Sequence, residues 1–120
     1  MRRTSHRSGL RAELAAGWFL RAKGYRILAT RYKTPVGEID IVARRGRTLA
    51  FIEVKARPRI ADAAESIHAR NRQRVVRAAQ HFLSAHPALA DRTIRFDALL
   101  IAWYRWPKHL AAAFDAAAAF

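Results

Sequence analysis

The sequence predicts an α/β protein in which helices pack on a central mixed β-sheet. Apolar residues recur at helical spacing over 9–23 and again over 70–85. Between these stretches, residues 36–57 form two arms that alternate apolar and charged side chains, the period-two pattern of a β-hairpin. The predicted order is a helix, three strands, a helix and a fourth strand, with a further helix at the C-terminus.

The size and composition of the chain suit one compact domain. Its 120 residues, 52% of them hydrophobic, are enough to bury about two thirds of the unfolded surface. Residues 1–8 are basic and carry no apolar pattern. We therefore expect a flexible basic arm over 1–8, followed by a single domain over 9–120.

The charge balance indicates a polyanionic partner. Twenty-three Lys and Arg against nine Asp and Glu give a formal net charge of +14, and neutralising phosphates releases counterions. A ribosome-associated protein, or one from a GC-rich genome with inflated arginine and alanine counts, would show the same excess. The absence of cysteine excludes disulfides and zinc–thiolate sites. No apolar run approaches the roughly 20 residues that cross a bilayer, so we expect a cytoplasmic protein without membrane contact.

The first helix is predicted over 9–23, where its apolar stripe consists of Leu10, Leu14, Trp18 and Ala22. Gly24 ends it. Residues 25–33 read as the first strand, and 34–37 as the turn into the second.

The hairpin over 36–57 is the centre of the prediction. Its first arm is expected to place alternate residues on opposite faces, with Ile39, Ile41 and Ala43 on one and Glu38, Asp40 and Val42 on the other. Its second arm is expected to do the same, with Ala50, Ile52 and Val54 on one face and Phe51, Glu53 and Lys55 on the other.

The register of this hairpin depends on where its two-residue loop lies. A loop at 45–46 would place Glu38 opposite Glu53, and a loop at 46–47 would place Asp40 opposite Glu53. In both registers the side chains of Asp40 and Glu53 share one face of the sheet.

The second half of the chain supplies one helix and one buried strand. Proline at 58 ends the hairpin, because proline donates no hydrogen bond to a sheet. A loop over 59–71 leads into a helix over 70–85, and a strand follows over 93–103. Asp97 interrupts this apolar strand, and its expected partner is Arg95 or Arg92. The alanine-rich segment 108–120 reads as a terminal helix.

Asp40, Glu53 and Lys55 form the candidate catalytic group. Carboxylate oxygens suit a hard cation such as Mg²⁺, which keeps several waters and takes further ligands from a substrate phosphate. A lysine one pleat away can orient a water or offset charge on the phosphate. An Asp followed by Glu-x-Lys is also common by chance, and the alternative is an amphipathic hairpin with a solvated face.

Four segments resemble a known family. They are Gly-Tyr-Arg-Ile-Leu at 24–28, Gly-Glu-Ile-Asp at 37–40, Phe-Ile-Glu-Val-Lys at 51–55 and Arg-Phe-Asp at 95–97. Their order and spacing resemble the small bacterial YraN-like proteins, predicted members of the PD-(D/E)xK superfamily that are similar to archaeal Holliday junction resolvases. The resemblance implies a restriction-endonuclease-like α/β/α sandwich and a site for Mg²⁺ or Mn²⁺.

The resemblance also implies roles for residues beyond the hairpin pair. Glu13 matches an acidic metal-site residue on the first helix, and the Val54 carbonyl matches a further ligand. The alternative for Glu13 is a surface ion pair with Arg11 or Arg21. Asn71 stands where the family commonly has lysine, so an ordinary surface role for Gln73 stays open. The expected nucleic-acid contacts are Gln73, Arg57, Arg70 and Arg74.

The functional hypothesis is metal-dependent hydrolysis of phosphodiester bonds in DNA, with branched DNA as one candidate substrate. Asp40, Glu53 and Glu13 would hold the cation, and Lys55 would position the attacking water. The alternatives are a nucleic-acid-binding module without catalysis and a protein-interaction adaptor on the same fold. A homodimer is compatible with each of them.

Overall fold

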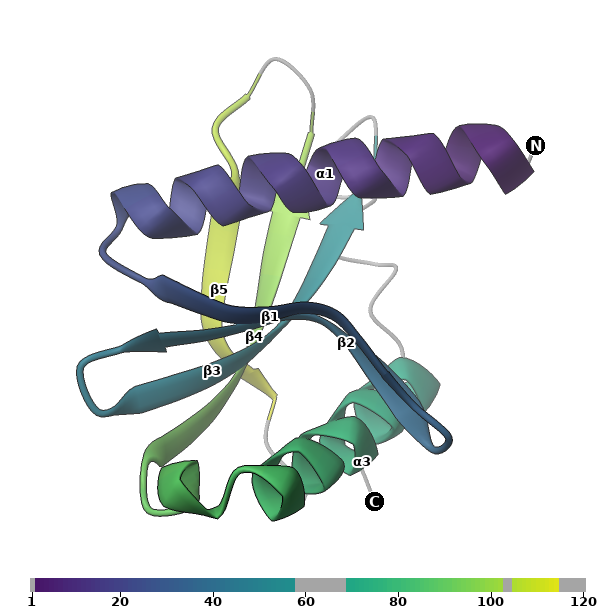
Figure 1. The fold of residues 1–120 in the computed structure, drawn as a ribbon. Helices are drawn as coiled ribbons and strands as arrows, with labels where there is room; N and C mark the ends of the chain where they lie inside the picture. Colours follow the sequence, from purple (N-terminus) through teal and green to yellow (C-terminus); the bar gives the residue numbers. More distant parts are fainter. Residues whose placement is uncertain (1, 58–68, 103–104, 115–120) are drawn as a thin grey trace.

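The structure, a computed structural model, describes residues 2–57, 69–102 and 105–114. Along the chain its elements are α1 (Arg2–Ala22), β1 (Arg26–Thr34), β2 (Gly37–Arg45), β3 (Thr48–Ala56), α3 (Ala69–Ala85), the short 3-10 helix η1 (Pro87–Leu89), β4 (Thr93–Ile101) and β5 (Lys108–Phe114) (Figure 1). The predicted order of helix, three strands, helix and strand is confirmed up to β4. Within the described ranges, no helix is long and apolar enough to cross a membrane.

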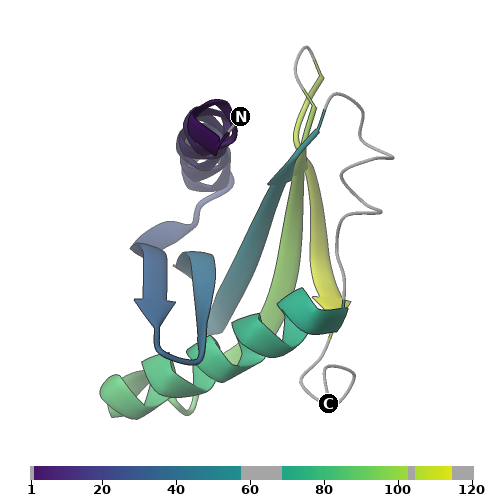
Figure 2. The ribbon, with the colours of Figure 1, turned by 90° about the vertical axis from the view of Figure 1, so that its right-hand side faces the viewer.

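The five strands form one mixed sheet in the order β1-β2-β3-β4-β5. β3 and β4 pair in parallel, and the other neighbours pair antiparallel. Helices α1 and α3 lie on opposite faces of this sheet (Figure 2). Alternate residues of β3 divide between the two layers: Leu49 and Phe51 pack with α3, while Ala50 and Ile52 pack with α1.

The register of the β2–β3 hairpin matches the second of the two predicted alternatives. Arg45 pairs with Thr48, so the loop consists of Gly46 and Arg47, and Gly46 has a φ of 60°. The pairing runs from there to Ile41 and Ile52 and then stops. One further step along this register places Asp40 opposite Glu53, at the point where the two strands cease to pair.

A bend in the β1–β2 hairpin changes which face its distal part covers. Ile41 belongs to the core under α1, but Ile39 joins the core under α3. The prediction that these two side chains share a face is therefore wrong. Arg31, on the neighbouring strand, has a φ of 53°, and this left-handed residue accompanies the bend. Figure 1 shows both strands curving together toward α3.

The chain end differs from the prediction of a terminal helix over 108–120. Residues Lys108–Phe114 form β5, which pairs antiparallel with β4. Alanine favours a helix, but the otherwise unpaired edge of β4 offers backbone hydrogen bonds, and tertiary contacts override local propensity. Phe114 adds to this by stacking on Phe96 of β4. Residues 115–120 lie outside the described residues.

Helix α1 begins at Arg2, inside the segment for which the sequence predicted an arm. Its anchored part is further on, where Ala12, Ala16 and Leu20 are buried against the sheet. The predicted apolar stripe is therefore wrong, because Leu14 and Trp18 are 67% and 70% exposed. Extending an anchored helix by one residue adds one backbone hydrogen bond without a new nucleation cost, so the basic segment can continue it. As predicted, the helix stops before Gly24, which has a φ of 93°.

Candidate active site

The predicted hairpin residues line one small pocket. It has a volume of about 80 Å³ and is lined by Glu38, Asp40, Glu53, Lys55, Arg74 and Val75. A second pocket of about 170 Å³ shares two of these carboxylates and is lined by Glu13, Arg31, Lys33, Glu38, Ile39 and Asp40. The structure thus gathers side chains from α1, β1, β2, β3 and α3 around Asp40.

Asp40 lies where the hairpin pairing ends. Its Oδ2 accepts a hydrogen bond of 2.7 Å from the N–H of Val54, which gives that amide a side-chain acceptor in place of a sheet partner. Burial raises the pKa of Asp40 to about 6, and the nearby charges of Glu13 and Glu53 act in the same direction. The Val54 hydrogen bond opposes this rise in pKa. Near neutral pH the carboxylate is therefore charged but destabilised.

Glu53 is the most enclosed carboxylate of the pocket, with a residue exposure of 5%. Its Oε1 lies 3.1 Å from the Nζ of Lys55. Its Oε2 is buried without a hydrogen-bond partner. A buried carboxylate oxygen without a partner is costly, and an ion or water in the pocket would satisfy it.

The donor set fits a divalent cation held by two carboxylates. Within the described residues, no group of three or more His, Asp or Glu side chains is arranged to hold a metal ion. Mg²⁺ does not require three, because it commonly uses one or two carboxylates with waters and substrate oxygens. Asp40 and Glu53 supply those two, and the unpartnered Oε2 of Glu53 supports the fit. The predicted carbonyl contribution of Val54 stays a prediction.

Glu13 approaches this centre from α1, but it faces the second pocket. Its Oε1 lies 3.8 Å from the Nε of Arg31 on β1, and its charge acts on Asp40. Arg31 was not among the ion-pair partners considered from the sequence. The sequence offered no sign of Arg31 as a site residue, because its proximity to Glu13 arises only when α1 packs on β1.

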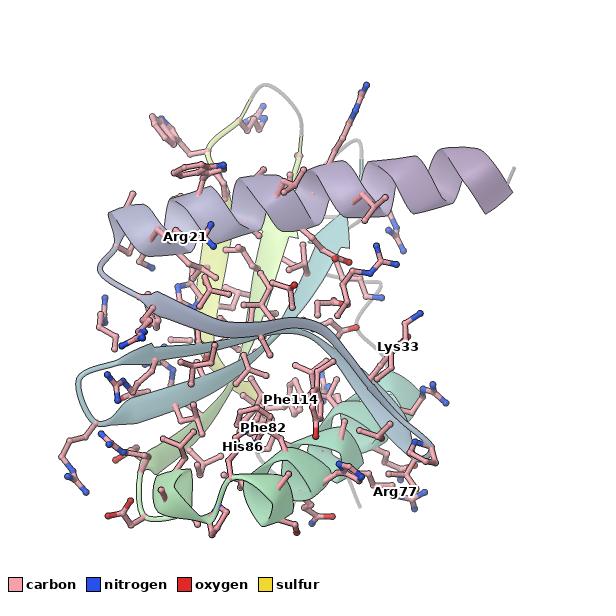
Figure 3. All side chains as sticks on the ribbon, viewed as in Figure 1. Arg21, Lys33, Arg77, Phe82, His86 and Phe114 are labelled. Atoms are coloured by element: carbon pink, nitrogen blue, oxygen red, sulfur yellow. The ribbon has the colours of Figure 1, made fainter. Side chains whose placement is uncertain are left out.

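The predicted nucleic-acid contacts fall into three groups. Arg74 lines the first pocket, and Gln73 is half-buried beside it on α3. Arg57 is exposed at the end of β3. The side chain of Arg70 lies outside the described residues. Lys33, which the sequence did not indicate, lines the second pocket and projects from the hairpin on the same side of the view as Arg77 of α3 (Figure 3).

A close contact between the hairpin turn and α3 fixes the position of Arg74. A Cβ atom added at Gly37 would lie 1.9 Å from the backbone oxygen of Arg74. Only glycine allows this approach. On the other side of the turn, the Thr34 hydroxyl donates to the Gly37 carbonyl and accepts from the Gly37 N–H. The turn and the helix therefore form one wall of the pocket.

A second polar cluster lies between α1 and the β4–β5 edge. Asp97, fully buried, accepts hydrogen bonds from Arg95, from His109 and from the backbone N–H of Ala112. Burial tends to raise the pKa of Asp97, but these bonds, that of His109 first, outweigh it and lower the pKa to about 2. The predicted partner Arg95 is confirmed. Because His109 and Ala112 belong to β5, the cluster holds that strand in place.

The chain matches a known family over most of its length. The model of uncharacterised protein family UPF0102 matches residues 12–101. A UPF0102 protein of Rhodopseudomonas palustris (strain BisB18) is 56% identical over 110 residues, which cover 92% of this chain and 82% of the relative. A UPF0102 protein of Nitrobacter winogradskyi is 54% identical over 116 residues, which cover 97% of this chain and 98% of the relative.

Proposed function

We propose that this chain, which belongs to the uncharacterised protein family UPF0102, is a metal-dependent endonuclease that hydrolyses phosphodiester bonds in DNA. The observation that carries the proposal is the pocket in which Asp40 and Glu53 meet beside Lys55. Paired carboxylates, one with an unpartnered oxygen, next to a lysine on the same strand suit cation-assisted phosphodiester hydrolysis.

Each side chain then has a defined task. Asp40 and Glu53 would hold Mg²⁺ or Mn²⁺, which when bound polarises the phosphate and lowers the pKa of a coordinated water. The N–H of Val54 orients the Asp40 carboxylate. Lys55, 3.1 Å from Glu53, would orient the attacking water and offset charge on the phosphate. The cations of the rim, including Arg74, would draw in the DNA backbone.

The fold supports the same proposal. A mixed sheet with α1 and α3 on opposite faces, and with Asp40 and the Glu53-Val54-Lys55 run on adjoining strands, resembles the restriction-endonuclease-like sandwich of the PD-(D/E)xK enzymes. The formal charge of +14 suits a nucleic-acid substrate. The same resemblance and charge support a cytoplasmic DNA-directed role.

The test is a cleavage panel with matched variants. Linear duplex, flap, single-stranded and four-way-junction DNA would be incubated with Mg²⁺ or Mn²⁺, using wild type, Lys55→Ala and Asp40→Asn. We expect the wild type to nick at least one substrate, and both variants to lose cleavage while keeping salt-sensitive binding. Cleavage that survives in both variants would show that this pocket is not the active site.

A second candidate function is a nucleic-acid-binding module without catalysis. It is favoured by the lack, among the described residues, of a group of three metal-binding side chains. Binding to a four-way junction with no nicking under any divalent ion would establish this alternative.

A further inference from the structure

We propose that Arg31 binds a phosphate of the substrate in the pocket that it shares with Glu13 and Asp40. This inference rests on the proposed function, because it assigns a substrate contact to the same site. Nothing in the sequence pattern sets Arg31 apart from the other exposed cations of the chain. Three features of Arg31 support this role: its backbone conformation, its position opposite Asp40 and its ion pair with Glu13.

The backbone of Arg31 is in a conformation that arginine rarely adopts. Its φ of 53° lies in the left-handed region, which glycine and asparagine enter at lower cost. The other described residue of this kind that is not glycine is Ala112, and there the conformation directs an N–H to the buried Asp97. At Arg31 the left-handed conformation accompanies the bend of the β1–β2 hairpin, and glycine would adopt it with less backbone strain. Keeping an arginine there needs a reason that lies in its side chain.

The position of Arg31 points to that reason. Thr30 pairs with Ile41, and Tyr32 pairs with Ile39, so Arg31 stands opposite Asp40 on the neighbouring strand. Its side chain lines the second pocket together with Glu13 and Asp40. The guanidinium is therefore directed toward Glu13, a carboxylate of this pocket, and not into the solvent beyond the strand.

The ion pair of Arg31 is loose enough to be exchanged. The Nε lies 3.8 Å from Oε1 of Glu13, beyond hydrogen-bond distance, and a third of the Arg31 side chain is exposed. A guanidinium carries five donors in a planar fork that matches two phosphate oxygens. A phosphate entering the pocket of about 170 Å³ would find these donors beside Asp40, one of the two carboxylates that are proposed to hold the cation. Arg31 would then neutralise the phosphate from the second pocket, while Lys55 lines the first.

The strain at Arg31 allows a test that separates a functional role from a structural one. Arg31→Asn removes the charge but suits the left-handed backbone, so a purely structural role predicts unchanged activity with equal or higher stability. We expect the melting temperature to rise by about 4 °C and the rate of DNA cleavage to fall about 100-fold. Arg31→Lys keeps a charge without the fork and should retain part of the activity. Arg26→Asn, which removes an exposed charge from the other end of β1, is the matched control and should cleave like wild type.

Binding supplies a second readout that does not depend on catalysis. If Arg31→Asn loses one phosphate contact, the slope of the logarithm of the DNA association constant against the logarithm of the salt concentration should become less steep by about 0.9 for a linear duplex. Arg26→Asn should leave this slope unchanged. If the wild type binds DNA but never cuts it, the proposed nuclease function fails while this slope still decides on Arg31. The proposal for Arg31 is overturned if Arg31→Asn cleaves DNA at the wild-type rate. If the wild type does not cleave DNA, the proposal is overturned when Arg31→Asn and Arg26→Asn change the salt dependence of binding equally.

Discussion

Replacing Asp40 with asparagine should stabilise the protein while abolishing its response to divalent ions. The asparagine side chain can still accept the Val54 N–H, but it carries no charge to bury. The pKa of Asp40 is raised from 3.8 to about 6, and about two pKa units correspond to about 3 kcal/mol of unfolding free energy. At pH 7.5 without metal, Asp40→Asn should therefore be more stable than wild type by up to about 3 kcal/mol, or roughly 10 °C in Tm.

The pH dependence of this difference identifies its cause. A carboxyl whose pKa is higher in the folded than in the unfolded state binds its proton more tightly when folded, so Asp40 lowers wild-type stability as the pH rises from about 4 to about 6. The stability difference between Asp40→Asn and wild type should be near zero at pH 4 and reach its plateau above pH 6. Urea denaturation of both proteins at five or six pH values measures it. Glu38→Gln, which neutralises an exposed carboxylate of the same pocket, is the control and should change stability by less than about 0.5 kcal/mol.

Metal addition completes the experiment. At a Mg²⁺ or Mn²⁺ concentration of 100 times Kd, wild type should gain about 2.7 kcal/mol, and Asp40→Asn should gain little. Two results would refute the reasoning. One is an Asp40→Asn variant that is less stable than wild type at pH 7.5 without metal. The other is a stability difference that does not vary between pH 4 and pH 7.

Three further predictions concern the surroundings of the site. Gly37→Ala should destabilise the fold by about 3 kcal/mol, because the new methyl group meets the Arg74 backbone. Urea denaturation should show a smaller loss of about 1 kcal/mol for Gly46→Ala, whose added Cβ has open space but whose φ of 60° strains an alanine. Equal losses in the two variants would contradict the close contact. Asp97→Asn should lower the free energy of unfolding by about 3 kcal/mol, because it removes the charge that Arg95 and His109 surround. In the wild type, protonation of Asp97 should lower the free energy of unfolding by about 2 kcal/mol as the pH falls from about 4 to about 2. Equal acid sensitivity of wild type and Asp97→Asn would contradict that assignment. Lys55→Ala should reduce cleavage at least about 100-fold with little change in DNA affinity, and a variant that instead loses affinity would place Lys55 in binding.

The sequence predicted correctly those elements in which apolar or charged residues recur at a fixed spacing. Helix α3 buries one side only, so its apolar residues recur with a period of 3.6 residues. The middle of the β2–β3 hairpin is buried on both faces, but toward the site its charged and apolar residues alternate with period two, and few positions were possible for its loop. That periodicity was enough to place Asp40, Glu53 and Lys55 on one face, and in the structure these three side chains line the same pocket.

The parts that the sequence could not give depend on contacts between distant segments. Residues 108–114 favour a helix locally, yet they pair with β4 because Asp97 and the strand edge need partners. The exchange of faces between Ile39 and Ile41 accompanies a bend of the β1–β2 hairpin. The register of this hairpin shifts between Ile27 and Ala29, and Arg31 has a left-handed backbone, but no local signal in the sequence marks either feature. The pairing of Arg31 with Glu13 likewise arises only after α1 has docked.

The hydrogen bond from Val54 to Asp40 makes one amide proton a reporter of the pocket's occupancy. Because its acceptor is a titrating carboxylate, the ¹H and ¹⁵N resonances of Val54 should shift with a midpoint near pH 6. A divalent ion that competes for the same oxygen should move them at constant pH. A single peak in a heteronuclear spectrum could thus follow proton, cation and substrate in turn, without a label, a dye or a cleavage product.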